Sequence, residues 1–234
     1  SAAAPKVNLL DFDHEGLTAW CAGIGEKAFR ATQLSRWLHR HVEGDFDNMT
    51  NLAKAFRAKL KDMAEVRPPV PITEKKSADG TRKWLFDVGN GNAVESVFIP
   101  DETRGTLCIS TQAGCAMGCL FCSTGKQGFN RNLTTAEIVG QLWWAERELR
   151  RDAGVTDPND RIISNVVLMG MGEPLDNFDN VMKAIEVLTA EWGFAWSPKR
   201  ITLSTIGVIP ALKKYLDGCR CHVAVSLHNP FGEE

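Results

Sequence analysis

The chain has 234 residues, which is enough for one large domain or for a small domain and a medium-sized one. Apolar residues make up 44% of it and charged residues 24%, which is ordinary for a globular protein and excludes a disordered chain. Its 27 Lys and Arg against 29 Asp and Glu give a formal net charge of −2, which excludes a wholly basic nucleic-acid binder but allows a local basic face. Because no apolar run could cross a bilayer and no signal peptide is recognisable, we expect a soluble, cytoplasmic protein that has no membrane partner.

The first 66 residues are predicted to form short helices. Their apolar residues recur at helical spacing, and the predicted helices cover residues 15–21, 26–42 and 51–63. Residues 26–61 carry eight Lys or Arg and four Asp or Glu, a local excess of +4. This charge has two interpretations, a solvated helix face or a surface for RNA phosphates. We assign residues 1–66 to a helical, helix-hairpin-helix-like accessory domain that binds RNA.

The next segment is predicted to contain a linker and a β-hairpin. Arg67-Pro68-Pro69-Val70-Pro71 cannot continue a helix and is the best candidate for a linker. Two strand-like runs, residues 83–88 and 93–99, flank Gly89-Asn90-Gly91-Asn92, which is a strong signal for a hairpin turn. We therefore assign residues 67–105 to a linker followed by a hairpin.

Strands and helices are then predicted to alternate, which indicates the α/β class. The predicted strands are residues 106–111, 165–170, 200–205 and 221–226, and the predicted helices are residues 134–150, 177–192 and 209–216. Short apolar runs separated by helical segments are typical of a parallel sheet with crossover helices. Four strands are too few for a closed barrel, so we expect either an open sheet or a fragment of a longer protein.

Three of the seven cysteines, Cys115, Cys119 and Cys122, fall within eight residues. In a reducing compartment such a cluster indicates metal binding or catalysis rather than disulfides. Gly114 and Gly118 allow the backbone to wrap the three thiolates around one centre. A closed zinc site requires four ligands in two pairs, and Cys219-Arg220-Cys221 is too tightly spaced to supply the second pair. An iron–sulfur cubane with three cysteine ligands leaves its fourth iron open to a small molecule.

The string from Gln112 to Arg131 contains this cluster and resembles the signature of radical S-adenosylmethionine (SAM) enzymes. It is most similar to the dual-specificity RNA adenine C2-methyltransferases, the RlmN family, and to the related C8-methylating resistance enzymes. Met169-Gly-Met-Gly-Glu-Pro-Leu-Asp-Asn177 and Ser226-Leu-His228 continue the match to the end of the chain. The resemblance implies that residues 106–234 are the N-terminal part of a radical-SAM (β/α) barrel, with four of its six strands.

The resemblance also implies the cofactors, partners and reaction. The three cysteines would hold a [4Fe–4S] cluster, and SAM would bind the open iron and be cleaved by one-electron reduction. Adenine C2 offers no lone pair to an ordinary methyl donor, so radical chemistry is physically reasonable there. The implied partners are 23S ribosomal RNA, transfer RNA and a one-electron donor such as flavodoxin.

Individual roles follow from the same resemblance. Glu95 would accept the proton of the substrate carbon, and Cys108 would resolve the enzyme–RNA adduct by forming a disulfide with a second cysteine. The residues implied to contact SAM are Gly172, Glu173, Ser204, Ser226, Leu227 and His228. From the residues alone, Glu95 would be a surface carboxylate and Cys108 a buried structural thiol. Cys21, Cys219 and Cys221 are expected to be core residues.

The sequence departs from the family in one respect. The cysteine that carries the methyl group lies in the family's C-terminal part, and no cysteine follows Cys221 here. The catalytic set is therefore incomplete, and we expect the chain to be a fragment. The alternatives are the C8 methylase, a non-catalytic iron–sulfur redox protein and a plain RNA-binding module, and only the first of these accounts for the Gly172-Glu173 and Ser226–His228 segments.

Overall fold

The computed structural model describes residues 3–115, 131–205 and 209–225. The chain forms two compact units, and each is assembled from three stretches of the sequence. Unit 1 consists of Ser1–Pro69, Thr134–Ile162 and Met182–Trp196, and unit 2 of Val70–Leu133, Ile163–Val181 and Ser197–Glu234. Among the residues described, no helix combines the length and the apolar character that a membrane span requires.

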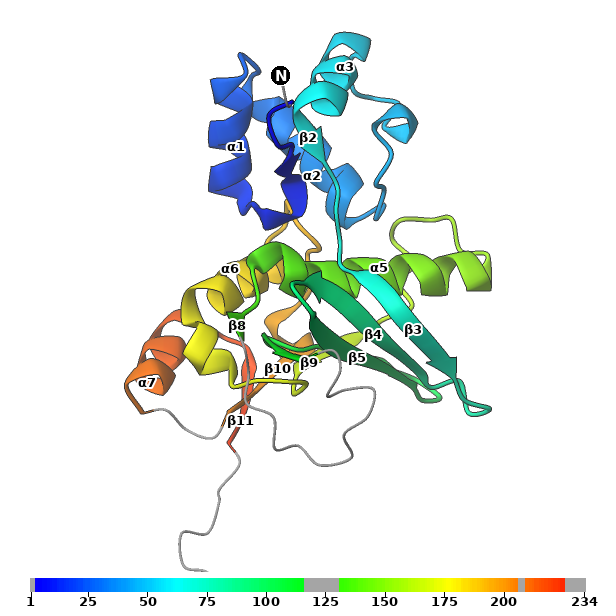
Figure 1. Ribbon diagram of the computed structural model, residues 1–234, viewed down its shortest axis with the longest axis vertical. Helices are drawn as coiled ribbons and strands as arrows, with labels where there is room; N and C mark the ends of the chain where they lie inside the picture. Colours follow the sequence, from blue (N-terminus) through cyan, green and yellow to red (C-terminus); the bar gives the residue numbers. More distant parts are fainter. Residues whose placement is uncertain (1–2, 116–130, 206–208, 226–234) are drawn as a thin grey trace, which may run out of the picture. The chain divides into compact units, whose positions relative to one another are not determined.

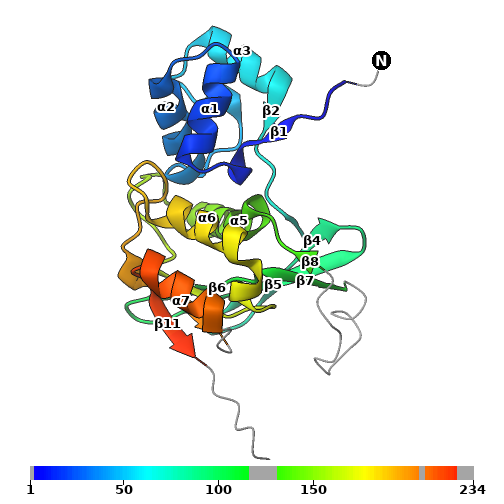
Figure 2. The same ribbon diagram turned by 90° about the vertical axis from the view of Figure 1, so that its left-hand side faces the viewer.

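Unit 1 begins with the three predicted helices, α1 (His14–Gly23), α2 (Ala28–His39) and α3 (Lys54–Met63) (Figure 2). Two short strands, β1 (Val7–Asn8) and β2 (Ala64–Glu65), pair in parallel and bring the two ends of this region together. The helices are amphipathic, and their apolar stripes form one buried core. Its members are Leu9, Leu17, Cys21, Ala31, Leu34, Leu38, Phe46, Met49, Leu52, Phe56, Leu60 and Ala64.

The long helix α5 (Thr135–Ala153) packs with these N-terminal helices inside unit 1. It starts at a capping box of Thr134 and Glu137 and ends at Gly154, which has a φ of 67° that glycine adopts without strain. The indole nitrogen of Trp143 donates a hydrogen bond to the main-chain oxygen of Leu38, at 2.8 Å. A Cβ on Gly44 would lie only 3.2 Å from the Trp143 ring, so the chain approaches this ring very closely.

Unit 2 contains the predicted parallel strands (Figure 1). They are β6 (Gly105–Cys108), β9 (Asn165–Leu168), β10 (Ile201–Thr205) and β11 (His222–Val225). Each pairs in parallel with the next, in the order β6-β9-β10-β11. The α/β class and the four parallel strands are thus confirmed, and their order in the sheet is a finding of the structure. The helices α6 (Phe178–Thr189) and α7 (Ile209–Gly218) also lie where they were predicted.

Three antiparallel strands extend the same sheet beyond β6. The predicted hairpin is present as β4 (Arg82–Gly89) and β5 (Asn92–Pro100), and its turn places Asn90 and Gly91 at positive φ, 54° and 73°. β3 (Val70–Lys76) was missed, because the prolines before and within it indicated only a linker. It is the last strand in the sheet order, where proline is tolerated.

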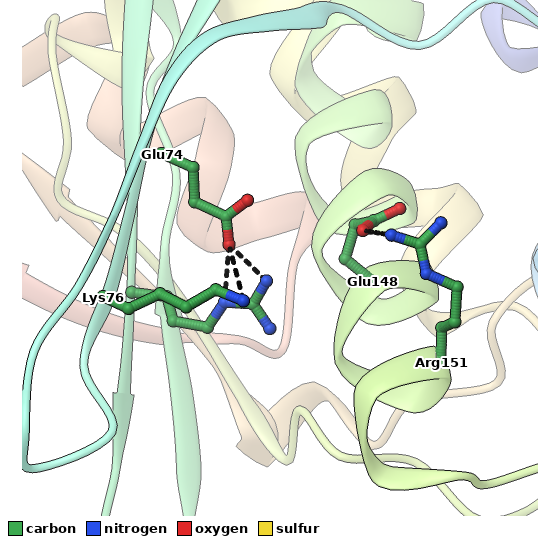
Figure 3. A network of polar contacts seen from close by, with 5 residues as sticks. Glu74, Lys76, Glu148 and Arg151 are labelled. Atoms are coloured by element: carbon green, nitrogen blue, oxygen red, sulfur yellow. Dashed lines mark hydrogen bonds and ion pairs between the residues drawn. The ribbon is translucent and has the colours of Figure 1, made fainter.

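Charged side chains connect β3 to β4. Glu74 accepts a hydrogen bond from Nε of Arg82 at 2.9 Å and lies 3.8 Å from Nζ of Lys76 (Figure 3). The Arg82 side chain is almost fully buried, so its charge requires this carboxylate. The predicted hairpin is therefore part of a three-stranded antiparallel extension over residues 70–100, because β3 lies where only a linker was predicted.

Two further short strands flank the segment that carries the cysteine cluster. β7 (Gln112–Cys115) pairs antiparallel with β5 and with β8 (Arg131–Asn132), and neither short strand was predicted. A 3-10 helix, η3 (Pro174–Asn177), lies between β9 and α6.

Candidate functional site

Strands β6, β9 and β10 of unit 2 have one buried and one half-exposed face. In β6, β9 and β10 every second residue is buried, as Leu107, Val166 and Leu203 are. The residues between them are only partly buried and include Thr106, Cys108, Val167, Thr202 and Ser204. Ser204 thus lies on the half-exposed face, one residue before the carboxyl end of β10, opposite Ala224 of β11.

Glu95 and Cys108 lie on this same half-exposed face. Cys108 of β6 is paired with Val97 of β5, and Glu95 is two residues from Val97, so the side chains of Glu95 and Cys108 are diagonal neighbours. The Glu95 side chain is 42% exposed, and its Oε1 lies 3.5 Å from Nζ of Lys83 on β4. Burial raises the pKa of the Cys108 thiol, which is therefore protonated at neutral pH.

The segment after β9 runs unusually close to the segment after β6. The amide of Gly170 donates to the oxygen of Ile109 at 3.0 Å, and the amide of Thr111 donates to the oxygen of Met171 at 2.9 Å. A Cβ on Gly170 would lie 2.5 Å from Oγ of Ser110. Only glycine fits at this distance, which gives a physical reason for the Met-Gly-Met-Gly pattern.

Gly172 is constrained twice. Its φ of 104° is rarely adopted by other residues, and a Cβ there would lie 2.6 Å from Cβ of Gln112. The close approach places the next residue, Glu173, where its amide donates to Oε1 of Gln112 at 2.9 Å.

The Glu173 carboxylate is oriented by two hydrogen-bond donors. Its Oε1 accepts from the amide of Leu175 at 3.2 Å, as the N-cap of η3, and from the hydroxyl of Thr205 at 2.5 Å. Thr205 is the last residue of β10, and Glu173 follows β9, so the pair joins the carboxyl ends of two neighbouring parallel strands. Such an edge is where ligands bind in parallel α/β sheets.

Both flanks of the cysteine segment are held by amide side chains. Asn177 is buried, and its Nδ2 donates to the oxygen of Thr111 at 2.9 Å and to that of Leu133 at 2.8 Å. Gln112 donates through Nε2 to Oδ1 of Asn132 at 2.8 Å. These bonds fix the β7–β8 pair, the described flanks on either side of the cysteine segment.

Three of these residues, Gln112, Asn177 and Thr205, were not predicted to act at the site. Gln112 and Asn177 stood in the two strings that carried the resemblance, and Thr205 closes a predicted strand. The available signal was a polar residue within or directly after an apolar run, where a buried side chain needs a hydrogen-bond partner. Periodicity alone could not show which main-chain groups each one would reach.

Several predicted residues lie outside the part of the chain described. These are Cys119, Cys122, Ser226, Leu227 and His228, and of Cys115 only the main chain is described, as the last residue of β7 opposite Asn92. The described residues alone contain no group of three His, Cys, Asp or Glu that could hold a metal.

Cys219 differs from the expected core residue. Cys21 and Cys221 are buried, but Cys219 is only partly so, and its Sγ accepts a hydrogen bond from the amide of Cys221 at 3.4 Å. A hydrogen bond with the Cys221 side chain lowers the pKa of Cys219 to about 6, whereas the same bond and burial raise the pKa of Cys221.

Comparison with known proteins gives two family matches and a similar structure. Residues 7–66 match the ribosomal RNA large subunit methyltransferase N-terminal domain, RlmN_N, and residues 109–231, more than half of the chain, match the radical SAM superfamily. A crystal structure of a radical SAM methyltransferase from Sphaerobacter thermophilus is 38% identical, with a TM-score of 0.82. The similarity covers 96% of this chain and 64% of that one, so the chain spans just under two thirds of that protein's length.

Replacement of Gly172 with alanine is expected to destabilise unit 2 more than an ordinary glycine replacement. Gly89 is the matched control, since its φ of 85° is also positive but its Cβ would meet no atom within 4 Å. Gly89→Ala should cost about 1–2 kcal/mol of unfolding free energy from strain alone. Gly172→Ala adds a clash, so a larger loss is expected in urea unfolding, and equal losses would contradict the close approach.

The thiol pair gives a pH-dependent prediction. A thiol is mostly thiolate above its pKa, so Cys219 should react with iodoacetamide with a midpoint near pH 6. The pKa values of Cys221 and Cys108 are raised, so these two thiols should react slowly at pH 7. Cys221→Ala removes the hydrogen bond and should move the midpoint of Cys219 upwards, and Cys221→Ser keeps a donor and should move it less. Peptide mass spectrometry reads each site, and a midpoint unaffected by Cys221→Ala would refute the pairing.

Proposed function

Because this chain belongs to the RlmN family of the radical SAM superfamily, we propose that the protein carrying it methylates C2 of adenosine in 23S ribosomal RNA and in transfer RNA. The observation that carries the proposal is the presence of both family segments in one chain, an RlmN-type N-terminal domain followed by a radical SAM domain. A redox protein has no need of the first segment, and a plain RNA-binding module has no need of the second.

Membership of the superfamily implies a [4Fe–4S] cluster and SAM, and the residues present fit these groups. The three thiols follow one another at the spacing Cys115-x₃-Cys119-x₂-Cys122, starting at the last residue of β7, and we propose that they hold the cluster. The Glu173 carboxylate stands at the carboxyl edge of the parallel strands, held by Thr205 and Leu175. When bound, the cluster and SAM supply the one-electron chemistry that activates a carbon without a lone pair.

We assign the SAM contacts to the carboxyl edge of the sheet. Glu173 is positioned to accept hydrogen bonds from an ammonium group, a charge-assisted interaction that also fixes orientation. Gly172 allows the main chain to turn there without a side chain. Ser204 lies on the half-exposed face of β10 close to this edge, and Ser226, Leu227 and His228 follow β11 in the sequence.

Two residues of the half-exposed face are proposed to act on the substrate. Glu95 would accept the proton from the adenine carbon, and the Cys108 thiol would resolve the enzyme–RNA adduct by forming a disulfide with a second cysteine. Their diagonal placement on adjacent strands supports a shared task, because both side chains project from the same face. Burial raises the pKa of Cys108 and keeps it protonated, so the thiol would stay unreactive until the adduct has formed.

The remaining assignments follow from the same proposal. The helices of residues 1–66 would contact RNA phosphates, a one-electron donor such as flavodoxin would serve the cluster, and the protein would work in the cytoplasm. The proposed domain order is an accessory RNA-binding domain over residues 1–66, the antiparallel extension over 67–105 and the barrel part over 106–234.

The reaction is tested on RNA. Anaerobically reconstituted enzyme containing this chain, supplied with SAM and reductant, should produce 2-methyladenosine, identified by mass spectrometry of digested RNA. Glu95→Gln should abolish the product while leaving cluster content unchanged. Asp87→Asn is the matched control, because it removes an exposed carboxylate from the neighbouring strand β4, two residues from Leu85, which is the partner of Glu95 in the sheet. 8-Methyladenosine would transfer the protein to the C8 class, and no methylated adenosine at all would refute the proposal.

The role of Glu173 is tested by SAM binding. Glu173→Gln removes the charge but keeps an acceptor, and loss of a charge-assisted bond of about 1.5–3 kcal/mol should weaken SAM binding about tenfold or more. Asp176→Asn changes an exposed carboxylate three residues away in η3 and should leave the affinity unchanged. Calorimetry on the reconstituted protein measures both, and equal affinities for the two variants would exclude Glu173 as a SAM contact.

A further inference from the structure

Unit 1 contains a pocket that none of the assignments above uses. It has a volume of about 120 Å³, and its lining residues come from the end of α2, the end of α5, the loop after α5 and the loop after α6. The lining consists of His39, Arg40, Arg150, Pro158, Asn159, Arg161, Phe194 and Ala195. A cavity of about 10–15 Å³ already holds one water molecule, so the pocket has room for a tetrahedral anion.

Three arginine residues line this small space. Arg150 is buried, and it pairs through Nε with Glu146 at 2.8 Å and donates through Nη1 to the oxygen of Arg40 at 2.8 Å. The Arg40 guanidinium donates to the main-chain oxygen of Glu191. No carboxylate in the described part of the chain lies within 4 Å of the Arg40 guanidinium, so its charge is opposed only by that carbonyl dipole.

Arg161 is the third cation, and it comes from the exposed loop after α5. Its guanidinium carbon stands 4.9 Å from the centre of the Trp196 ring, and its Nη1 donates weakly to the oxygen of Phe194 at 3.4 Å. The aromatic ring supports one face of the guanidinium plane.

The remaining lining residues add no negative charge. Burial lowers the pKa of His39 to about 3, so its imidazole is neutral, and its Nδ1 has no hydrogen-bond partner among the described residues. Asn159 is held by Asp157, which accepts from its amide nitrogen at 3.1 Å. Ala195 has a φ of 57°, a strained conformation that alanine rarely adopts and that is characteristic of functional sites.

The positive charge of Arg150 also affects the pKa of the neighbouring side chain His41. Burial lowers the pKa of His41, the charge of Arg150 lowers it further, and Glu43 acts in the opposite direction.

We propose that this pocket binds one phosphate group of the RNA backbone. Guanidinium groups match the geometry of phosphate oxygens and hold them through paired, charge-assisted hydrogen bonds. The inference rests on the proposed function for the identity of the polymer, since a free inorganic phosphate would present the same oxygens. It extends that function by adding Arg150 and Arg161, which lie outside residues 1–66, to the RNA-contacting surface.

The pocket also shows how the two family segments cooperate. His39 and Arg40 belong to the RlmN-type match, whereas Arg150, Asn159 and Arg161 belong to the radical SAM match, and all of them lie in unit 1. Neither segment alone provides the set of donors.

The test compares Arg40→Gln and Arg161→Gln with Arg151→Gln in the 234-residue chain. Arg151 is the matched control because it is one residue from Arg150 on α5, is exposed, pairs with Glu148 (Figure 3) and does not line the pocket. Every variant removes one positive charge, so a general electrostatic effect is common to all three. Thermal unfolding first confirms that each variant folds, and Arg161→Lys provides a second variant that keeps the charge but not the paired donors.

The measurement is the affinity for an RNA stem-loop across a salt series. Loss of one phosphate contact should reduce the slope of log affinity against log salt by about one, with about a tenfold loss of affinity in low salt. Arg40→Gln and Arg161→Gln should show this effect, and Arg151→Gln should show much less. Effects equal to those of Arg151→Gln would overturn the proposal.

Two outcomes separate this proposal from the proposed function. If the unsubstituted chain binds RNA and the pocket variants show the same affinity and the same dependence of affinity on salt, the pocket assignment fails and the methyltransferase proposal stands. If the unsubstituted chain binds no RNA but inorganic phosphate stabilises it, and does so less in the Arg40 and Arg161 variants, the pocket is a site for a free anion and the RNA assignment is refuted.

Discussion

The site depends on one close approach of main chain to main chain. Residues 170–172 lie against residues 109–112 at a distance that admits no side chain on Gly170 or Gly172. Hydrogen bonds between these segments, including the two accepted by the oxygen of Met171, replace water on both sides. As a result, Glu173 lies at the end of β10, and β7, from which the cysteine-bearing segment continues, is held in place by these hydrogen bonds. A substitution that widened this contact would displace the carboxylate and the flanks of the cysteine segment together, because they share the same support.

The sequence was a good guide where a periodic pattern determines the structure. Helices α1 to α3, α5 and α6, the β4–β5 hairpin and the four parallel strands follow from apolar spacing and from turn residues, which act locally. β3 was missed because proline in an edge strand is indistinguishable from proline in a linker until the neighbouring strand is known. The short strands β7 and β8 exist only because distant residues pair, so no local pattern could indicate them.

The candidate site shows the same division. The cysteine spacing and the Gly-Glu-Pro motif mark the chemistry in the sequence, and the structure adds the side chains that orient it. Thr205 and Gln112 act on Glu173 across 32 and 61 residues of chain, respectively. Hydrogen bonds of this kind depend on the register of parallel strands, which the order of the residues does not display.

Trp143 determines which piece of this protein could be exchanged with a relative. Its indole is bonded to the main chain of Leu38 and lies against Gly44, and Gly140, one turn earlier on α5, would clash with Pro69 if it carried a side chain, at 2.4 Å. A chimera joined at residue 66 would therefore pair the helices of one protein with the α5 surface of another and would expose or crowd a large aromatic ring. Exchange of this region between relatives is better attempted with α1 to α3 and α5 moved as one cassette, with the tryptophan and its two glycine neighbours kept from the same parent.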